Sequence, residues 1–194
     1  MKKLIDWAVS THQQAIQILP INDTTITNTW MDSYPYNSIS IYAFHPMYID
    51  LRQLGKLKDK EALAFYEEKR KELNALPQID YEAVSNTKRA YLKSMYQQTG
   101  KKVLASAEFK KFFKENEHWL LPYAAFSYLR DQYGTPNFSQ WPEHNEYHAD
   151  EIAAMCIPES DCYEEIAFYY YIQYNLHIQL LDAGNYAREK GHYL

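Results

Sequence analysis

The chain has 194 residues, a hydrophobic content of 46% and a formal net charge of −5, so it is long enough for one domain that buries roughly 70% of its unfolded surface. Nucleic acids and anionic membranes favour a basic protein face, so the acidic charge argues against both as partners. No apolar run approaches the roughly 20 residues of a membrane span, and the N-terminal segment lacks the apolar core of a signal peptide. We therefore expect a soluble, cytoplasmic protein.

The first quarter of the chain predicts a helix, a strand and a long polar loop. Residues 3–14 form an amphipathic pattern, with apolar or small side chains at helical spacing on one face: Leu4, Trp7, Ala8 and Thr11. An apolar run follows almost without a linker and predicts a buried strand over residues 15–20, centred on Ile16 to Leu19. After the loop, residues 46–54 predict a short helix that ends at Gly55.

Two helices are predicted in the middle of the chain. Residues 58–74 carry dense Glu/Lys pairs at helical spacing, which is typical of a solvated helix without catalytic meaning. Pro77 interrupts the pattern. Asp80 then has the side chain and position of an N-cap for a helix that runs to about Gln98 and is closed by Gly100.

The last part of the chain is also predicted to be helical. One helix is expected over residues 106–114, and a second from Glu115 to Gly134, in which Pro122 is tolerated because it lies near the first turn. A Pro-containing loop leads to the final two helices, expected over residues 149–155 and 161–190. One strand and about eight helices predict a mainly α fold.

The residues that most often form metal or thiol sites are sparse. Cys156 and Cys162 are too few for a disulfide framework or a four-thiolate metal site, so we expect both to be reduced. His144 and His148 have the spacing that places two imidazoles on one helix face, with Glu146 between them. Their order is not that of the zinc-protease motif, and a polar surface is the preferred interpretation.

The segment from Gln17 to Leu51 is the most informative part of the chain. It resembles the second barrel strand and following loop of the 4-α-glucanotransferases, the amylomaltase or disproportionating-enzyme family (glycoside hydrolase family seventy-seven). The matching positions are Leu19, Pro20, Asp32, Ser33, Tyr36, Ser38, Ser40, Tyr42, Ala43, Pro46, Ile49, Asp50 and Leu51. One residue is extra, because the chain has Ser-Tyr-Pro-Tyr where the common form has Ser-Pro-Tyr. This form, Trp30 and residues 22–24 are similar to the plant cytosolic branch of the family.

Later segments extend the resemblance over almost the whole chain. Residues 79–88 are similar to the family's V-D-Y helix start, and residues 112–131 to its F-x-x-x-N-x-x-W-L-x-x-Y-A-x-F-x-x-L-R-D helix. Residues 141–143 match its W-P-E loop, and residues 169–191 its following barrel helix. The terminal segment 192–194 departs from the family pattern.

The resemblance implies a partial (β/α)8 barrel that is not closed, since a whole barrel takes about 250 residues. The expected parts are helix one, strand two with the substrate loop, the helical insertion, and helix two. Their expected ranges are 1–51 for the first helix, strand and loop, 52–158 for the insertion and 159–194 for the last helix. The chain is therefore expected to be a fragment of a glucanotransferase catalytic domain.

The resemblance also implies the chemistry. Retaining transfer between α-1,4-glucans requires two carboxylates roughly 5 Å apart, and in relatives both come from later strands, so no catalytic residue is assigned here. Tyr36 matches the tyrosine that packs against the sugar, and Ser33 matches the serine beside it. Asp32 is the third candidate substrate-binding residue, although orienting the loop is its preferred role. The loop is expected to expose Tyr36 at a concave surface. His45 departs from the common asparagine and is interpreted as a residue that packs or that supports the substrate-contacting side chains.

The implied partners are an α-glucan or maltooligosaccharide and the remainder of the catalytic domain, with no nucleotide, metal or other cofactor. A fragment with exposed apolar surface is also expected to self-associate. The alternative is a non-catalytic helical domain that binds carbohydrate or another protein.

Overall fold

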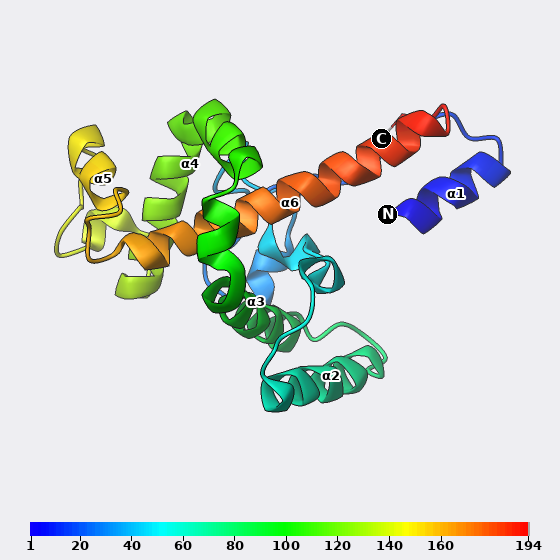
Figure 1. Cartoon of the computed structure of the whole chain (residues 1–194), viewed down its shortest axis with the longest axis horizontal. Helices are drawn as coiled ribbons and strands as arrows, with labels where there is room; N and C mark the ends of the chain where they lie inside the picture. Colours follow the sequence, from blue (N-terminus) through cyan, green and yellow to red (C-terminus); the bar gives the residue numbers. More distant parts are fainter. Residues whose placement is uncertain (194) are drawn as a thin grey trace.

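The computed structural model describes residues 1–193, and these residues are mainly helical (Figure 1). The α-helices are α1 Lys2–Ser10, α2 Lys60–Asn74, α3 Tyr81–Leu104, α4 Ala107–Tyr133, α5 Ala149–Met155 and α6 Tyr163–Glu189. Four 3₁₀ turns lie between them: η1 Trp30–Ser33, η2 Pro46–Tyr48, η3 Leu51–Leu54 and η4 Phe138–Gln140. The predicted mainly α fold is confirmed. No helix of this described part is long and apolar enough to cross a membrane.

Helix α6 forms the axis of the molecule (Figure 1). Its N-terminal half is apolar almost all round, which is typical of a helix buried on several sides. Helices α3 and α4 pack against this half, and α1 packs near the C-terminal end. Burial of one large apolar side chain contributes about 1.5–3 kcal/mol, so the run of buried α6 residues dominates the core: Ile166, Ala167, Phe168, Tyr169, Tyr170, Tyr171 and Ile172.

Two apolar clusters lie on different sides of α6. One joins α4 to α6 and includes Phe112, Leu120 and Ile166. The other joins α3 to α6 and also takes in Ile49 and Leu51, from the segment that follows the long loop. The chain from residue 22 to residue 57 is therefore fixed against three helices, although most of it has no regular secondary structure.

The helix starts follow the side-chain chemistry of the sequence. The Asp80 carboxylate accepts a hydrogen bond from the Ala83 N–H at 2.9 Å, and the Ser106 hydroxyl accepts one from the Phe109 N–H at 3.2 Å. Each satisfies an N–H group that the first helical turn leaves without a partner. At the other end of α4, Gly134 adopts the left-handed conformation with φ 67°, which ends the helix as predicted.

Two predicted helix boundaries inside the chain are wrong. Gly100 does not end α3, which continues to Leu104; the glycine instead accommodates the Tyr96 ring, which would lie 2.4 Å from a Cβ atom there. Helix α4 is continuous from Ala107 to Tyr133, so Pro122 lies in its interior and not near a first turn. Its apolar contacts with α6 on both sides of Pro122 maintain the helix despite the missing N–H donor.

The predicted strand over residues 15–20 is also wrong. The pairing of this segment is limited to one bridge between Ala15 and Tyr193, and residues 16–20 have no regular secondary structure. A strand needs a neighbour that continues the hydrogen-bond ladder, and residues 1–193 place none beside this run. The first helix ends at Ser10 rather than Gln14, and the helix expected over residues 46–54 is split into η2 and η3.

Candidate functional site

The loop over residues 22–45 carries the predicted substrate-binding residues, and its shape is set by a buried carboxylate. Asp32 lies in η1 and is 4% exposed. Its two oxygens accept hydrogen bonds from the Thr27 N–H at 3.0 and 3.1 Å, the Asn28 N–H at 2.7 Å and the Thr27 hydroxyl at 3.0 Å. Both Asp32 oxygens are therefore engaged by the loop itself, and a role of Asp32 in substrate binding remains a prediction.

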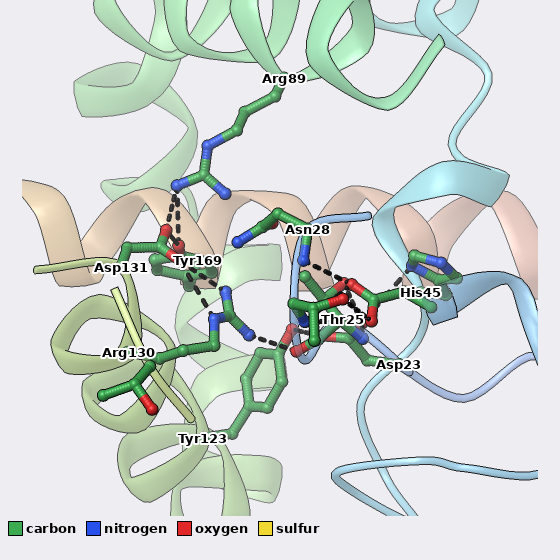
Figure 2. Close-up of polar contacts among 12 residues, drawn as sticks. Asp23, Thr25, Asn28, His45, Arg89, Tyr123, Arg130, Asp131 and Tyr169 are labelled. Atoms are coloured by element: carbon green, nitrogen blue, oxygen red, sulfur yellow. Dashed lines mark hydrogen bonds and ion pairs between the residues drawn. The ribbon is translucent and has the colours of Figure 1, made fainter. Parts of the chain in front are cut away.

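A second buried carboxylate anchors the loop to the helices. Asp23 is 1% exposed and accepts hydrogen bonds from the Tyr123 hydroxyl of α4 at 2.6 Å, the Thr25 N–H at 2.9 Å and the Thr25 hydroxyl at 2.6 Å. The Tyr123 pKa lies well above its ordinary value because burial and the Asp23 charge disfavour the phenolate. Tyr123 therefore remains a hydrogen-bond donor to Asp23 (Figure 2).

His45 connects Asp23 with α3. Its Nδ1 lies 3.4 Å from an Asp23 oxygen, and its Nε2 lies 2.5 Å from the Tyr81 hydroxyl. Burial lowers the pKa of His45, although the nearby Asp23 and Asp32 charges oppose this change. Neutral His45 can accept a hydrogen bond from the Tyr81 hydroxyl at Nε2 and direct its Nδ1–H toward Asp23.

A charged cluster connects the loop to α4, α3 and α6 (Figure 2). The Arg130 guanidinium donates to the Thr25 carbonyl at 2.7 Å and to one Asp131 oxygen at 2.9 and 3.0 Å. Arg89 and the Tyr169 hydroxyl bond to the other Asp131 oxygen. Burial raises the pKa of Asp131, but the Arg130 and Arg89 charges outweigh it and the net pKa is lowered, so the carboxylate is ionised.

Two glutamines of α6 hold the loop backbone in the same way. The Gln173 amide accepts from the Phe44 N–H and donates to the Phe44 carbonyl, both at 2.8 Å, and it also donates to the Tyr123 hydroxyl at 3.1 Å. The same pair of contacts recurs six residues further along both the loop segment and α6. There the Gln179 amide accepts from the Asp50 N–H at 2.8 Å and donates to the Asp50 carbonyl at 3.0 Å. These contacts fix both ends of the segment from Phe44 to Asp50 on α6.

Several aromatic side chains of this loop are exposed to solvent. Tyr36 is 62% exposed and Tyr34 61% exposed, with ring centroids 5.5 Å apart, and Trp30 is 68% exposed. Ser33 is also exposed. Tyr36 is therefore exposed, whereas its place at a concave surface and sugar contact by Tyr36 and Ser33 remain predictions. Such a surface offers apolar ring faces with hydroxyl edges.

Sequence reasoning missed most of the buried network. Asp23, His45, Tyr123, Gln173 and Arg130 were not assigned to the site, and all are buried. A signal was present for some of them, because Tyr123 and Arg130 are polar residues inside an otherwise apolar helical stretch. Buried polar groups need partners, so their positions could have indicated contacts with the loop.

The histidines and cysteines do not form a common site in the described residues. His144 lies 3.4 Å from a Glu151 oxygen and His148 3.8 Å from a Glu146 oxygen, so the two rings have different partners. No group of three or more potential metal ligands occurs within residues 1–193. Cys156 and Cys162 are both free thiols.

Comparison with known proteins gives a consistent family. The family model described as 4-alpha-glucanotransferase (glycoside hydrolase family 77) matches residues 1–194. The protein named 4-alpha-glucanotransferase DPE2 from Oryza sativa subsp. japonica is 39% identical over 98% of this chain, which covers 20% of the rice protein. A 4-alpha-glucanotransferase from Chlamydia trachomatis serovar D is 30% identical over 96% of the chain, which covers 34% of that relative.

A solved structure supports the fold. The amylomaltase from Streptococcus agalactiae in complex with acarbose superposes with a TM-score of 0.75 at 21% identity, covering 98% of this chain and 37% of that one. The chain spans about a fifth to a third of the length of the curated relatives it matches. The loop motif, the helical segments and the family match over residues 1–194 all agree. The chain belongs to the 4-alpha-glucanotransferase family.

Proposed function

We propose that the chain forms part of a 4-α-glucanotransferase that transfers α-1,4-glucan segments or glucosyl units from maltose or maltodextrins to an acceptor glucan. Its own contribution is substrate contact through the loop over residues 22–45. One observation carries the proposal: Tyr36 is 62% exposed on a loop whose base is fixed by buried Asp23 and Asp32. A rigid support reduces the ordering cost that a flexible sugar-binding ring would incur on binding.

The proposed reaction is a retaining double displacement, which needs a nucleophilic carboxylate and an acid/base carboxylate roughly 5 Å apart. The buried carboxylates of the loop are poorly suited to either role. Asp23 and Asp32 each accept three or more hydrogen bonds from backbone N–H groups and hydroxyls of the loop or of α4. We therefore assign the catalytic pair to the rest of a longer protein, which fits the greater length of the relatives.

In this proposal, residues 1–51 provide the first helix and the substrate loop, residues 52–158 the helical insertion, and residues 159–194 the last helix. The partners are a maltooligosaccharide and the remainder of the catalytic domain. A cytoplasmic location fits the two free thiols, Cys156 and Cys162, because reduced cysteines are usual in reducing compartments.

A second candidate is a helical domain that binds carbohydrate or protein without catalysis. The hydrogen-bonded state of Asp23 and Asp32 favours it for the chain taken alone, since both carboxylates serve to hold the loop. The first candidate requires that a longer protein supplies the catalytic carboxylates, and the second does not. Glucan contact at Tyr36 is expected for the first candidate and for the carbohydrate-binding form of the second, but not for its protein-binding form.

Retention on immobilised amylose tests glucan contact. The 194-residue chain should be retarded, and Tyr36→Ala should weaken binding about tenfold because a stacked aromatic ring contributes about 0.5–1.5 kcal/mol beyond its buried area. Tyr147→Ala is the matched control, since Tyr147 is similarly exposed, 65% against 62%, but lies just before α5. Equal retention of both variants and the unsubstituted chain would refute the assignment of Tyr36.

A further inference from the structure

A cavity of about 430 Å³ lies between α3, α4 and α6, away from the exposed ring of Tyr36. Its size is within the range of about 300–1,000 Å³ that is typical of small-molecule sites. The Arg89–Asp131–Tyr169 contacts seen in Figure 2 border it on one side. None of the residues assigned to substrate contact above lines it.

Aromatic side chains form the inner surface of this cavity. Phe168 and Tyr169 are buried at 3% and 5% exposure, beneath Lys93 and Arg89, whose cations lie 6.0 and 5.9 Å from the two ring centroids. Tyr96 and Tyr128 are half-buried and provide the ring surface that a ligand can contact. The Tyr96 ring lies over Gly100 one helical turn later, where a Cβ atom would be 2.4 Å from the ring. Its hydroxyl donates to Glu164 at 2.9 Å. A glycine in the interior of a helix costs about 1 kcal/mol relative to alanine, and here it permits this ring position.

The polar lining of the cavity is balanced in charge. It has three basic side chains, Arg89, Lys93 and Lys101, and three acidic ones, Asp131, Glu164 and Glu165. A site for an anion or a cation would have an excess of the opposite charge. The balanced lining therefore favours a neutral ligand.

Several lining groups are available to such a ligand. Within residues 1–193, no hydrogen bond or ion pair to another residue occupies the side chains of Lys93, Gln97, Lys101, Gln132 and Glu165. They comprise both donors and acceptors at the rim of an aromatic surface. A pyranose ring matches this arrangement, because its C–H faces pack on aromatic rings while its hydroxyl groups both donate and accept hydrogen bonds.

We propose that the cavity between α3, α4 and α6 is a second carbohydrate site, which binds a short α-1,4-glucan segment in addition to the contact at the Tyr36 loop. The glucan identity of the sugar rests on the proposed function. The carbohydrate class rests on the aromatic surface, the balanced charge and the unoccupied polar groups.

Amide chemical shifts of the ¹⁵N-labelled 194-residue chain, titrated with maltotriose, test the second site. Signals from the cavity, including those of Gln97, Lys101 and Gln132, should shift in a saturable manner. The double variant Gln97→Ala/Lys101→Ala should weaken this response about tenfold. The matched control Gln78→Ala/Lys102→Ala should leave it within about twofold, because Gln78 and Lys102 are exposed and lie outside the cavity.

The spectra separate this proposal from the proposed function, because signals of the loop over residues 33–42 report on the first contact independently. Shifts in the loop without shifts in the cavity would overturn the second site and leave the proposed function standing. Cavity shifts that the double variant weakens, and its control does not, support the second site whatever the loop signals do. Equal weakening in the double variant and its control would also overturn it, and dispersed spectra of both variants establish that each is folded.

Discussion

At the scale of single residues, the loop over residues 22–45 depends on buried polar groups. Asp23, Asp32, His45 and Gln173 are each at most 5% exposed, and each holds backbone or side-chain groups of the loop or its supporting helices. Removing one partner from a buried hydrogen bond costs about 1–3 kcal/mol because the other group stays desolvated. The position of Tyr36 is therefore sensitive to residues far from its ring.

Gln173→Glu should destabilise the chain. The substituted carboxylate retains an acceptor for the Phe44 N–H but cannot donate to the Phe44 carbonyl or the Tyr123 hydroxyl. We expect the free energy of unfolding to fall by about 2–4 kcal/mol in urea denaturation. Gln78→Glu makes the same chemical change at an exposed position and should stay within about 0.5 kcal/mol. Similar losses in both variants would contradict the role of Gln173 in holding Phe44 and Tyr123.

His45 should make stability depend on pH. Burial lowers its pKa below the ordinary value of 6.5, so the unfolded chain binds a proton that the native chain excludes. Its contribution to stability is complete above about pH 6.5 and is lost as the pH falls from there toward the native pKa. Unfolding at about pH 7.5 and pH 5.5 should therefore give a lower free energy at the acidic pH.

His45→Gln should reduce this pH dependence. The reduction is partial, because burial also lowers the pKa of His177, with Glu115 opposing it. His148→Gln alters an exposed ring and should leave the slope unchanged. An identical slope in His45→Gln and the unsubstituted chain would show that His45 is not the responsible group.

At the scale of elements, α3 contains a glycine whose role can be measured. Gly100→Ala places a Cβ atom 2.4 Å from the Tyr96 ring, which Phe168, Tyr171 and Glu164 hold in place. The usual helix gain of about 1 kcal/mol should be outweighed, giving a net loss of about 1–3 kcal/mol. Gly184→Ala in α6 meets only open space and the tip of Arg188, so it should stabilise by about 1 kcal/mol. The same sign for both variants would contradict this account.

The elements also show what sequence patterns can predict. Helix starts at Asp80 and Ser106 and the end at Gly134 were predictable, because caps act within one turn of the chain. Pro122 and Gly100 were misinterpreted because long-range packing against α6 overrides local preferences. The prediction of a strand near Ile16 is wrong because strand formation depends on a neighbouring segment, which an apolar run cannot specify.

The candidate site was predictable to a similar extent. The motif identified Tyr36, Ser33 and Asp32, of which Tyr36 is exposed and Asp32 is buried, and the substrate contacts of all three remain predictions. The loop that carries these residues is held by Gln173 and Tyr123, which bond to Phe44 and Asp23. These partners lie 100 or more positions away in the sequence. Such contacts are set by the tertiary fold and leave no local pattern.

At the scale of the whole molecule, the helices at the N- and C-terminal ends expose apolar side chains. Trp7 on α1 is 59% exposed, and Leu181 on α6 is 47% exposed. Because exposed apolar surface favours association, sedimentation velocity should show the chain self-associating as its concentration rises. The variant Trp7→Glu/Leu181→Glu should shift the distribution toward monomer.

Phe65→Glu is the control for self-association, because Phe65 is 61% exposed but lies on α2. It should leave the concentration dependence as in the unsubstituted chain. A monomer at all concentrations, or an equal effect of the control, would rule out association through α1 and the end of α6.

In the proposed function, this chain contacts an α-glucan without supplying the catalytic carboxylates. Substrate contacts that are equally strong in the ground state and the transition state do not lower the barrier of the chemical step. The most direct measurement is glucose release from maltotriose by purified chain that is retained on amylose. We predict no glucose above the level of the uncatalysed reaction. Glucose release that is abolished by substituting one of the chain's own Asp or Glu residues would contradict the claim, because it would place the catalytic pair within these 194 residues.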